Sequence, residues 1–282
     1  RSESTTPLMT VTTSTNPSAH WSDDERSVAI FTRGTTNTTM MMLTLNNPNR
    51  KTWVLKDAID PAHIVWQTNS DTQGLYVEEQ DVIVRFTPDT RQPIASITSS
   101  TLWRIDNDHR LWLYEPDTHR MTAHQNAEDF FSIPDEFTVE RIIDIGQKRV
   151  IVKTDRGILI VPKFDTGQSP TLLPTTEVQY NSFTREWLTW SPWELWAIYD
   201  NAPPTLFNRT SEKMINVLPL DPYGVLLIVT ERSFIAFNPG YSISHELWRG
   251  EEMKDVGVNQ KEKKIFFVGK VGSSTGLFKL PF

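Results

Sequence analysis

The sequence has 282 residues, a formal net charge of −7 and no cysteine. The absence of cysteine excludes disulfides, thiol catalysis and Cys-ligated zinc. The negative charge argues against a nucleic-acid partner, because binding to phosphates requires a basic surface. No apolar stretch approaches the roughly 20 residues that cross a bilayer, so no membrane span is predicted. The chain begins at Arg1, and we expect any export signal or anchor to lie upstream of it.

The chain divides by composition into a short lead-in and one long repetitive region. Residues 1–18 are rich in Ser and Thr and read as a lead-in, within which Leu8–Thr12 is strand-prone. Residues 19–282 contain ten Trp and most of the apolar runs. Large aromatic rings bury much apolar area between packed sheets. We therefore expect a single all-β domain over residues 19–282.

Short apolar runs recur along this domain at a spacing of roughly 35–40 residues, which is typical of repeat architectures. Each copy contains strand-length runs separated by Gly, Pro, Asn or Asp, as turns require. The expected strand segments, copy by copy, are 21–31, 40–45 and 53–55; 64–66, 74–77, 82–86 and 94–97; 102–105 and 111–114; 142–145, 149–153 and 158–161; 187–199 and 205–207; 215–217, 225–229, 234–237 and 247–248; and 256–258, 265–268 and 276–280.

This period predicts a closed β-propeller of about seven four-stranded blades, and six or eight blades remain possible because the third copy is short. The last copy ends after its third strand. A closed ring has no exposed sheet edge, so we expect Leu8–Thr12 to complete the final blade.

Several turns carry a family resemblance. The run Trp21-Ser-Asp-Asp-Glu-Arg-Ser-Val-Ala-Ile-Phe31 resembles the W-S-P-D-G motif of WD40-like propellers of the TolB type, and residues 190–199 and 221–228 resemble degenerate copies. Residues 206–217, with the loop Asn-Arg-Thr-Ser-Glu, and residues 255–280 resemble the propeller region of PEGA-domain proteins of candidate-phylum bacteria. That resemblance covers about residues 180–282.

The resemblance implies a bacterial, envelope-associated protein whose PEGA domain would lie upstream. It supplies no catalytic residues. The sequence also departs from the true WD40 pattern, because no Gly-His at a blade start is paired with a Trp-Asp at a blade end. The hydrogen-bond network of that family is therefore not expected.

Motifs for catalysis or metal binding are scarce. His119 and His124 lie in a polar loop, and Asp106-Asn107-Asp108 forms a turn-like cluster, but neither has the ligand spacing of a metal site. No nucleophile elbow, P-loop or dinucleotide fingerprint occurs. We therefore predict no catalytic residue, no metal and no cofactor. Carboxylates such as Glu78, Glu79 and Glu115 leave open a hydrolase or lyase that uses an axial funnel.

The most unusual local feature is the tryptophan run at 187, 190, 193 and 196. Pro192 argues for a strand–turn–strand rather than a helix, with Trp187 and Trp190 on opposite strand faces and Trp193 on the turn. An exposed turn Trp is a plausible contact for a protein or a sugar. The candidate binding residues are Trp193, Trp112 and Trp248. Packing between blades is the competing interpretation.

These observations favour a non-catalytic, extracytoplasmic binding or scaffold module. It would be a monomer that contacts protein or glycan at the cell surface through loops on one propeller face. Two alternatives remain open: an extracellular carbohydrate-active hydrolase or lyase, and an intracellular assembly scaffold of WD40 type. The fold alone does not decide among them.

Overall fold

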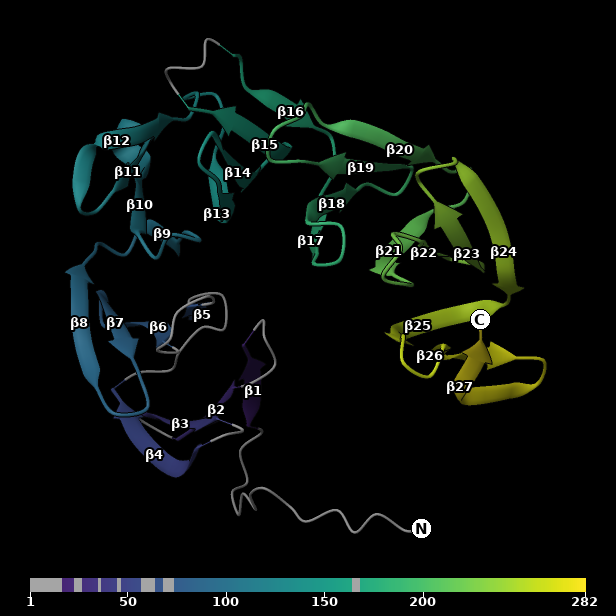
Figure 1. Cartoon of the computed structure of the whole chain (residues 1–282), viewed down its shortest axis with the longest axis horizontal. Helices are drawn as coiled ribbons and strands as arrows, with labels where there is room; N and C mark the ends of the chain where they lie inside the picture. Colours follow the sequence, from purple (N-terminus) through teal and green to yellow (C-terminus); the bar gives the residue numbers. More distant parts are fainter. Residues whose placement is uncertain are drawn as a thin grey trace. The chain divides into compact units, whose positions relative to one another are not determined.

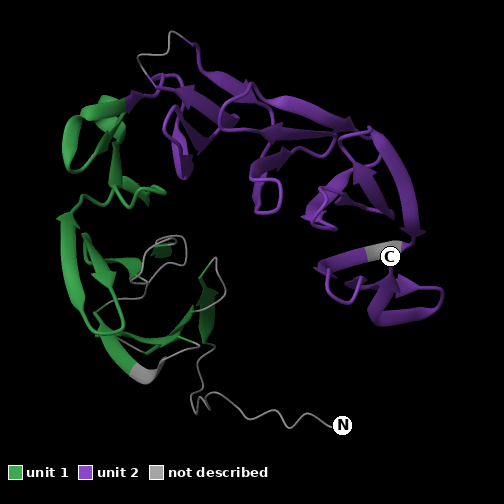
Figure 2. Ribbon diagram, in the orientation of Figure 1, with its two compact units in different colours: residues 1–130 green, residues 131–282 purple. Residues whose placement is uncertain are grey.

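The computed structural model describes residues 17–22, 27–34, 37–44, 47–56, 64–67, 74–163 and 168–282. Within these ranges, regular structure is almost entirely β, and the only helical element is the 3₁₀ turn η2 (Pro116–Thr118). No helix in the described part of the chain has the length and apolar character needed to cross a membrane. The chain forms two compact units, residues 1–130 and 131–282 (Figure 2).

The described strands form six four-stranded sheets and one three-stranded sheet, each in consecutive order along the chain (Figure 1). Neighbouring strands pair antiparallel. Seven successive antiparallel meanders confirm the prediction of an all-β, seven-bladed propeller fold. We number the sheets as blades 1–7 and call the strands of each blade A to D in chain order.

Unit 1 holds the first blades, and the boundary between the units falls inside the last strand of blade 3. Blade 1 comprises β1 (Ser18–Trp21), β2 (Ser27–Arg33), β3 (Thr38–Thr44) and β4 (Asn47–Leu55). Blade 2 comprises β5 (Ile64–Gln67), β6 (Gly74–Glu79), β7 (Val82–Phe86) and β8 (Arg91–Ser96). Blade 3 comprises β9 (Leu102–Ile105), β10 (Leu111–Glu115), β11 (Arg120–Ala123) and β12 (Asn126–Ser132).

Unit 2 holds the remaining blades. Blade 4 comprises β13 (Val139–Ile145), β14 (Arg149–Thr154), β15 (Gly157–Pro162) and β16 (Thr171–Leu173). Blade 5 comprises β17 (Glu177–Asn181), β18 (Glu186–Trp190), β19 (Glu194–Ile198) and β20 (Thr205–Arg209). Blade 6 comprises β21 (Met214–Pro219), β22 (Leu226–Thr230), β23 (Ser233–Asn238) and β24 (Ile243–Arg249). Blade 7 comprises β25 (Glu251–Asn259), β26 (Lys264–Val271) and β27 (Ser274–Pro281).

The final blade has three strands among the residues that the structure describes, as the repeat pattern predicts. The segment Leu8–Thr12, expected to supply a fourth strand, lies outside the described residues.

The meander order gives every blade two ends. Loops that join strands A to B and C to D lie at one end, which we call the AB end. Loops that join B to C, and D to the next blade, lie at the other, which we call the BC end. The AB ends of blades 6 and 7 are joined by a hydrogen bond from Gln260 Nε2 to the Pro219 carbonyl of 3.2 Å.

Apolar side chains on facing sheets form the cores between consecutive blades within each unit. Phe31 and Met40 of blade 1 pack with Leu75 and Phe86 of blade 2 in one such core. The B strands β14 and β22 are buried on both faces. Full burial of each large apolar side chain contributes roughly 1.5–3 kcal/mol, so these cores are the main stabilising contribution to the fold.

Among the described residues, three tryptophans link a blade to the blade before it through the indole N–H. Trp66 donates to the His20 carbonyl at 3.1 Å, and Trp103 donates to the Glu78 carboxylate at 2.8 Å. In unit 2, Trp187 donates to the Asp144 carboxylate at 2.9 Å. A ring of this kind contributes apolar area between blades while its one polar atom finds a partly buried acceptor.

Candidate functional site

The BC ends of blades 5 and 6 are joined by the segment Thr210–Met214, which is held from both sides. On the blade 5 side, the carbonyl of Trp193 accepts a hydrogen bond from the Thr210 amide at 3.0 Å. On the blade 6 side, the Lys213 carbonyl accepts from the Glu231 amide at 3.0 Å. The backbone of this segment therefore fixes the two hairpin tips relative to each other.

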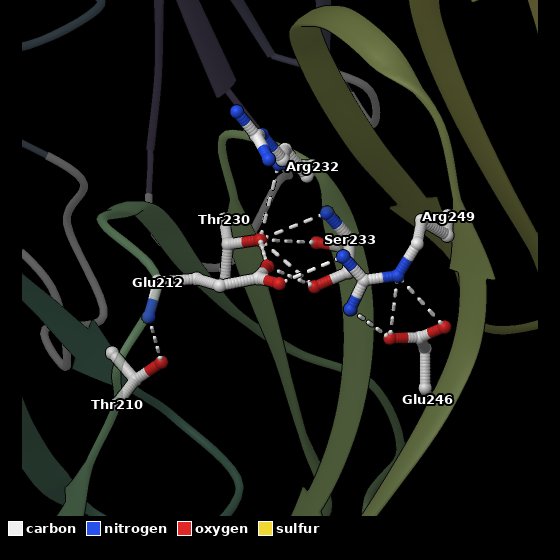
Figure 3. A network of polar contacts seen from close by, with 7 residues as sticks. All are labelled: Thr210, Glu212, Thr230, Arg232, Ser233, Glu246 and Arg249. Atoms are coloured by element: carbon white, nitrogen blue, oxygen red, sulfur yellow. Dashed lines mark hydrogen bonds and ion pairs between the residues drawn. The ribbon is translucent and has the colours of Figure 1, made fainter.

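Glu212, within that segment, is the centre of the polar network in Figure 3. Its Oε2 accepts hydrogen bonds from Thr230 Oγ1 at 2.8 Å and Ser233 Oγ at 2.9 Å. Its Oε1 accepts from Arg249 Nη1 at 2.8 Å. Arg249 also donates to Glu246, with Nη2 lying 2.6 Å from Oε2. The carboxylate thus joins the hairpin tip to strand D of the same blade.

These donors stabilise the charged form of Glu212. The hydrogen bond from Thr230, followed by those from Arg249 and Ser233, lowers the pKa of Glu212 to about 2. The two carboxylates around Arg249 raise its pKa in turn. Glu212 is therefore anionic at every physiological pH, which suits a structural acceptor rather than a general acid.

The sequence shows a related hairpin in blade 4, where Thr154-Asp-Arg-Gly157 matches Thr230-Glu-Arg-Ser233 of blade 6. In both, the amide of the arginine donates to the threonine Oγ1, at 3.2 Å in each case. Thr154 Oγ1 also donates to the Gly157 carbonyl at 2.9 Å. The threonine is thus a local turn element that blade 6 extends into a larger network.

Trp193 lies on the exposed tip of the blade 5 hairpin, as its position after Pro192 predicts, and its side chain is 52% exposed. The turn is rigid, because Ser191 Oγ accepts the amides of Trp193 at 3.2 Å and Glu194 at 3.1 Å. Arg209, which pairs across the sheet with Glu194, is also exposed and forms an ion pair with it at 2.9 Å. The exposed indole and the exposed arginine thus belong to the same hydrogen-bonded end of blade 5.

The other tryptophans of this run pack between blades, as expected for opposite strand faces. Trp187 packs with the residues of blade 4, whereas Trp190 packs with those of blade 6. Among the four, only Trp193 is free of an interblade core in the described structure.

Trp112 does not serve as a surface contact, contrary to the expectation from sequence. Its side chain is 1% exposed, and its indole N–H donates to Asp106 Oδ2 at 2.8 Å. Strand β10 is buried on both faces, so alternation along the strand brings none of its rings to the surface.

Trp248 is partly buried and packs with Phe234 and Phe267, with ring centroids 5.4 and 4.8 Å apart. A Cβ added at Gly250 would lie 1.8 Å from its ring, so the ring closely covers the backbone there. Its contacts assign Trp248 mainly to the core between blades 6 and 7 rather than to a binding surface.

The candidate carboxylates each have a partner within the protein. Glu78 accepts from Trp103, Glu115 accepts from Thr101 Oγ1 at 3.2 Å, and buried Glu79 forms an ion pair with Arg91. Asp106 accepts from the amides of Asp108 and Arg110, each at 2.9 Å, which explains the turn-like Asp-Asn-Asp cluster. Within the described residues, no group of three or more His, Asp or Glu is placed to hold a metal ion.

Comparisons with known proteins agree on the fold. No family model matches the chain, and no curated protein matches it in sequence. A solved eukaryotic initiation factor aligns over 98% of this chain and 87% of its own, with a TM-score of 0.55 and 9% identity. An oligogalacturonate lyase solved in complex with manganese aligns over 93% and 87%, with a TM-score of 0.53 and 8% identity.

Both structures are propeller folds, and the chain shares that fold with them. Identities this low carry no information about chemistry. The PEGA resemblance has no counterpart among these structures.

Proposed function

We propose that this chain is a non-catalytic binding module that recognises a protein partner at the BC ends of blades 5 and 6, with Trp193 as the central contact. The observation that carries this proposal is the half-exposed indole on a turn whose amides are fixed by Ser191. Rigid aromatic side chains lose little entropy on binding, and Trp and Arg are the residue types most enriched at interface hot spots.

The surroundings of Trp193 favour a protein over a glycan. Two exposed ion pairs lie at the same BC ends of blades 5 and 6: Arg209 with Glu194, and Lys213 with Glu231 at 3.0 Å. An apolar anchor surrounded by charges of both signs is typical of protein interfaces. Such rim charges set orientation and the rate of association more than affinity.

The test compares two exposed tryptophans. Trp21, 54% exposed on blade 1, provides the matched control. Wild-type protein, Trp193→Ala and Trp21→Ala are used for affinity capture from cells of the producing organism, and each captured protein is then purified and its Kd measured. We expect a partner retained by wild type and Trp21→Ala whose Kd rises at least about 30-fold with Trp193→Ala, as for a hot-spot residue.

The same three proteins applied to a glycan array address the competing class of ligand. Saturable glycan binding that is lost only in Trp193→Ala would contradict recognition of a protein. If Trp193→Ala and Trp21→Ala bound every purified partner with equal affinity, Trp193 would not be the binding contact. Circular dichroism of Trp193→Ala is expected to match wild type, because the indole packs in no described core.

We further propose that the module acts outside the cytoplasm, at the cell envelope. This proposal rests on the sequence resemblance of residues 180–282 to PEGA-associated propellers. Immunodetection of the native protein in fractionated cells tests it, and recovery in the cytosolic fraction would reject it in favour of an intracellular scaffold.

A further inference from the structure

A pocket of about 370 Å³ lies at the AB end of unit 2, between blades 4 and 5. Lys148 and Arg149 line it from the A–B loop and strand B of blade 4, and Gln168 and Ser169 line it from the C–D loop of blade 4. Asp200 and Asn201 contribute from the C–D loop of blade 5. It lies at the end of the blades opposite to Trp193, so it is independent of the proposed protein-binding surface.

Arg149 is the unusual residue of this pocket. Its side chain is only 9% exposed, yet among the described residues it forms one ion pair, from Nη2 to Asp200 Oδ1 at 2.9 Å. Its Nε and Nη1 are buried and have no hydrogen-bond partner among the residues that the structure describes. A guanidinium offers five N–H donors in a planar fork, so most of its capacity is unused.

This arrangement is energetically unfavourable as it stands. Burial lowers the pKa of Arg149, although nearby Asp200 and Asp144 raise it. Buried charged donors without acceptors cost free energy, and an acceptor that reaches them recovers that cost. Asp144 already accepts the indole N–H of Trp187, and Asp200 contacts the guanidinium through one oxygen only.

Asp200 itself is held weakly. The Asp200 side chain is 69% exposed on the C–D loop of blade 5. Gly146 has no side chain to confine it, and even a Cβ added at Gly146 would lie 3.6 Å from the Asp200 carboxylate. A competing anion can therefore replace it at Nη2 while Asp200 turns into solvent. Among the described lining residues, the charged ones are the cations Lys148 and Arg149 and the carboxylate of Asp200, a balance that favours an anionic occupant.

We propose that this pocket binds a small carboxylate ligand, which takes the Arg149 guanidinium in a bidentate manner and displaces Asp200. A planar carboxylate matches two parallel N–H donors of the fork, and Arg is the side chain best suited to this geometry. Among the described lining residues, Ser169, Thr171 and Asn201 are able to hydrogen-bond to polar groups of the ligand, and Ile160, Ala202 and three prolines supply apolar surface.

The test is calorimetric titration of the full chain with succinate at fixed ionic strength. We expect saturable binding. Arg149→Lys retains the charge but loses the fork, and should raise the Kd about tenfold or more. Asp200→Asn removes the competing carboxylate and should lower the Kd severalfold. Arg156→Lys, an exposed arginine at the BC end of blade 4, should leave the Kd unchanged.

The two pocket variants are expected to change the Kd for succinate in opposite directions. Asp200→Asn therefore tests the proposal even if Arg149→Lys folds poorly. Binding that is weakened rather than strengthened by Asp200→Asn would overturn the proposal. So would the absence of saturable succinate binding, or equal affinity in Arg149→Lys. A parallel titration with inorganic phosphate tests whether the pocket prefers a phosphate group to a carboxylate. A lower Kd for phosphate than for succinate would reject a carboxylate as the ligand.

Discussion

Blades 4 and 6 each place an arginine beside a carboxylate, and the two arginines differ in how far their donors are used. Arg249 of blade 6 is half exposed and donates through Nε, Nη1 and Nη2 to Glu246 and Glu212. Arg149 of blade 4 is buried and donates through Nη2 alone. Arg249, whose three guanidinium nitrogens all donate within the protein, stabilises blade 6. Arg149, whose Nε and Nη1 have no acceptor among the described residues, is where we propose that a ligand supplies the missing acceptors.

The largest expected effect concerns the hairpin at the BC end of blade 4. Gly157 has a φ of +137°, and an added Cβ would lie 2.3 Å from the Leu173 carbonyl oxygen. Gly157→Ala should lower the free energy of unfolding by about 3–5 kcal/mol, because both the backbone and strand β16 must shift. Urea denaturation measures this.

Gly276→Ala is the control for that change, since nothing lies within 4 Å of a Cβ added there. Its effect should stay within about 1 kcal/mol. Equal effects at the two glycines would show that the close approach to Leu173 does not constrain the blade 4 hairpin.

The next effect concerns the saturated network of blade 6. Glu212→Ala leaves the fully buried hydroxyls of Thr230 and Ser233 without their shared acceptor. We expect a loss of about 2–4 kcal/mol in urea denaturation. Glu231→Ala removes only an exposed ion pair with Lys213 and should cost less than about 1 kcal/mol. If Glu212→Ala lowered the free energy of unfolding by no more than Glu231→Ala, the buried network would contribute no more stability than the exposed ion pair.

The pH dependence of stability provides a second test of the Glu212 network. The pKa of Glu212 is about 2 in the folded protein, against the ordinary value of 4.5 for a glutamate. Because the folded value is the lower one, the carboxylate contributes stability that is fully present above pH 4.5 and is lost as the pH falls toward 2. The difference in unfolding free energy between wild type and Glu212→Gln should therefore shrink between pH 4.5 and 2 in chemical denaturation.

The smallest effect is expected at the buried arginine. Arg149→Met replaces an incompletely paired charge with an apolar chain of similar length, and the remaining Asp200 is exposed enough to be hydrated. Its effect on unfolding should lie within about 1 kcal/mol of zero in either direction. A loss above about 3 kcal/mol would show that Arg149 is a structural residue like Arg249.

The sequence predicted the buried strands well and the polar ones poorly. Every copy of the repeat corresponds to one blade, because apolar runs such as those of β14 and β22 must lie between two sheets. Five of the described strands were not predicted: β1, β11, β12, β16 and β17. None contains an apolar run of more than two residues, and β1 and β12 are largely exposed, so tertiary pairing rather than local pattern makes them strands.

The candidate site was predictable only where a local signal existed. Pro192 breaks the strand and thereby places Trp193 on a turn. The loop around Glu212 was recognised through its resemblance, although its role as an acceptor was not. The pairing of Arg149 with Asp200 joins residues 51 positions apart on different blades, and no local pattern reports such a contact.

The three tryptophan contacts between blades share a direction. The donors Trp66, Trp103 and Trp187 each bind an acceptor that lies earlier in the chain. During synthesis, the acceptor has therefore already left the ribosome when its indole emerges. Each of these blades can dock onto its finished predecessor without waiting for downstream sequence, which suits a sequential assembly from the amino terminus.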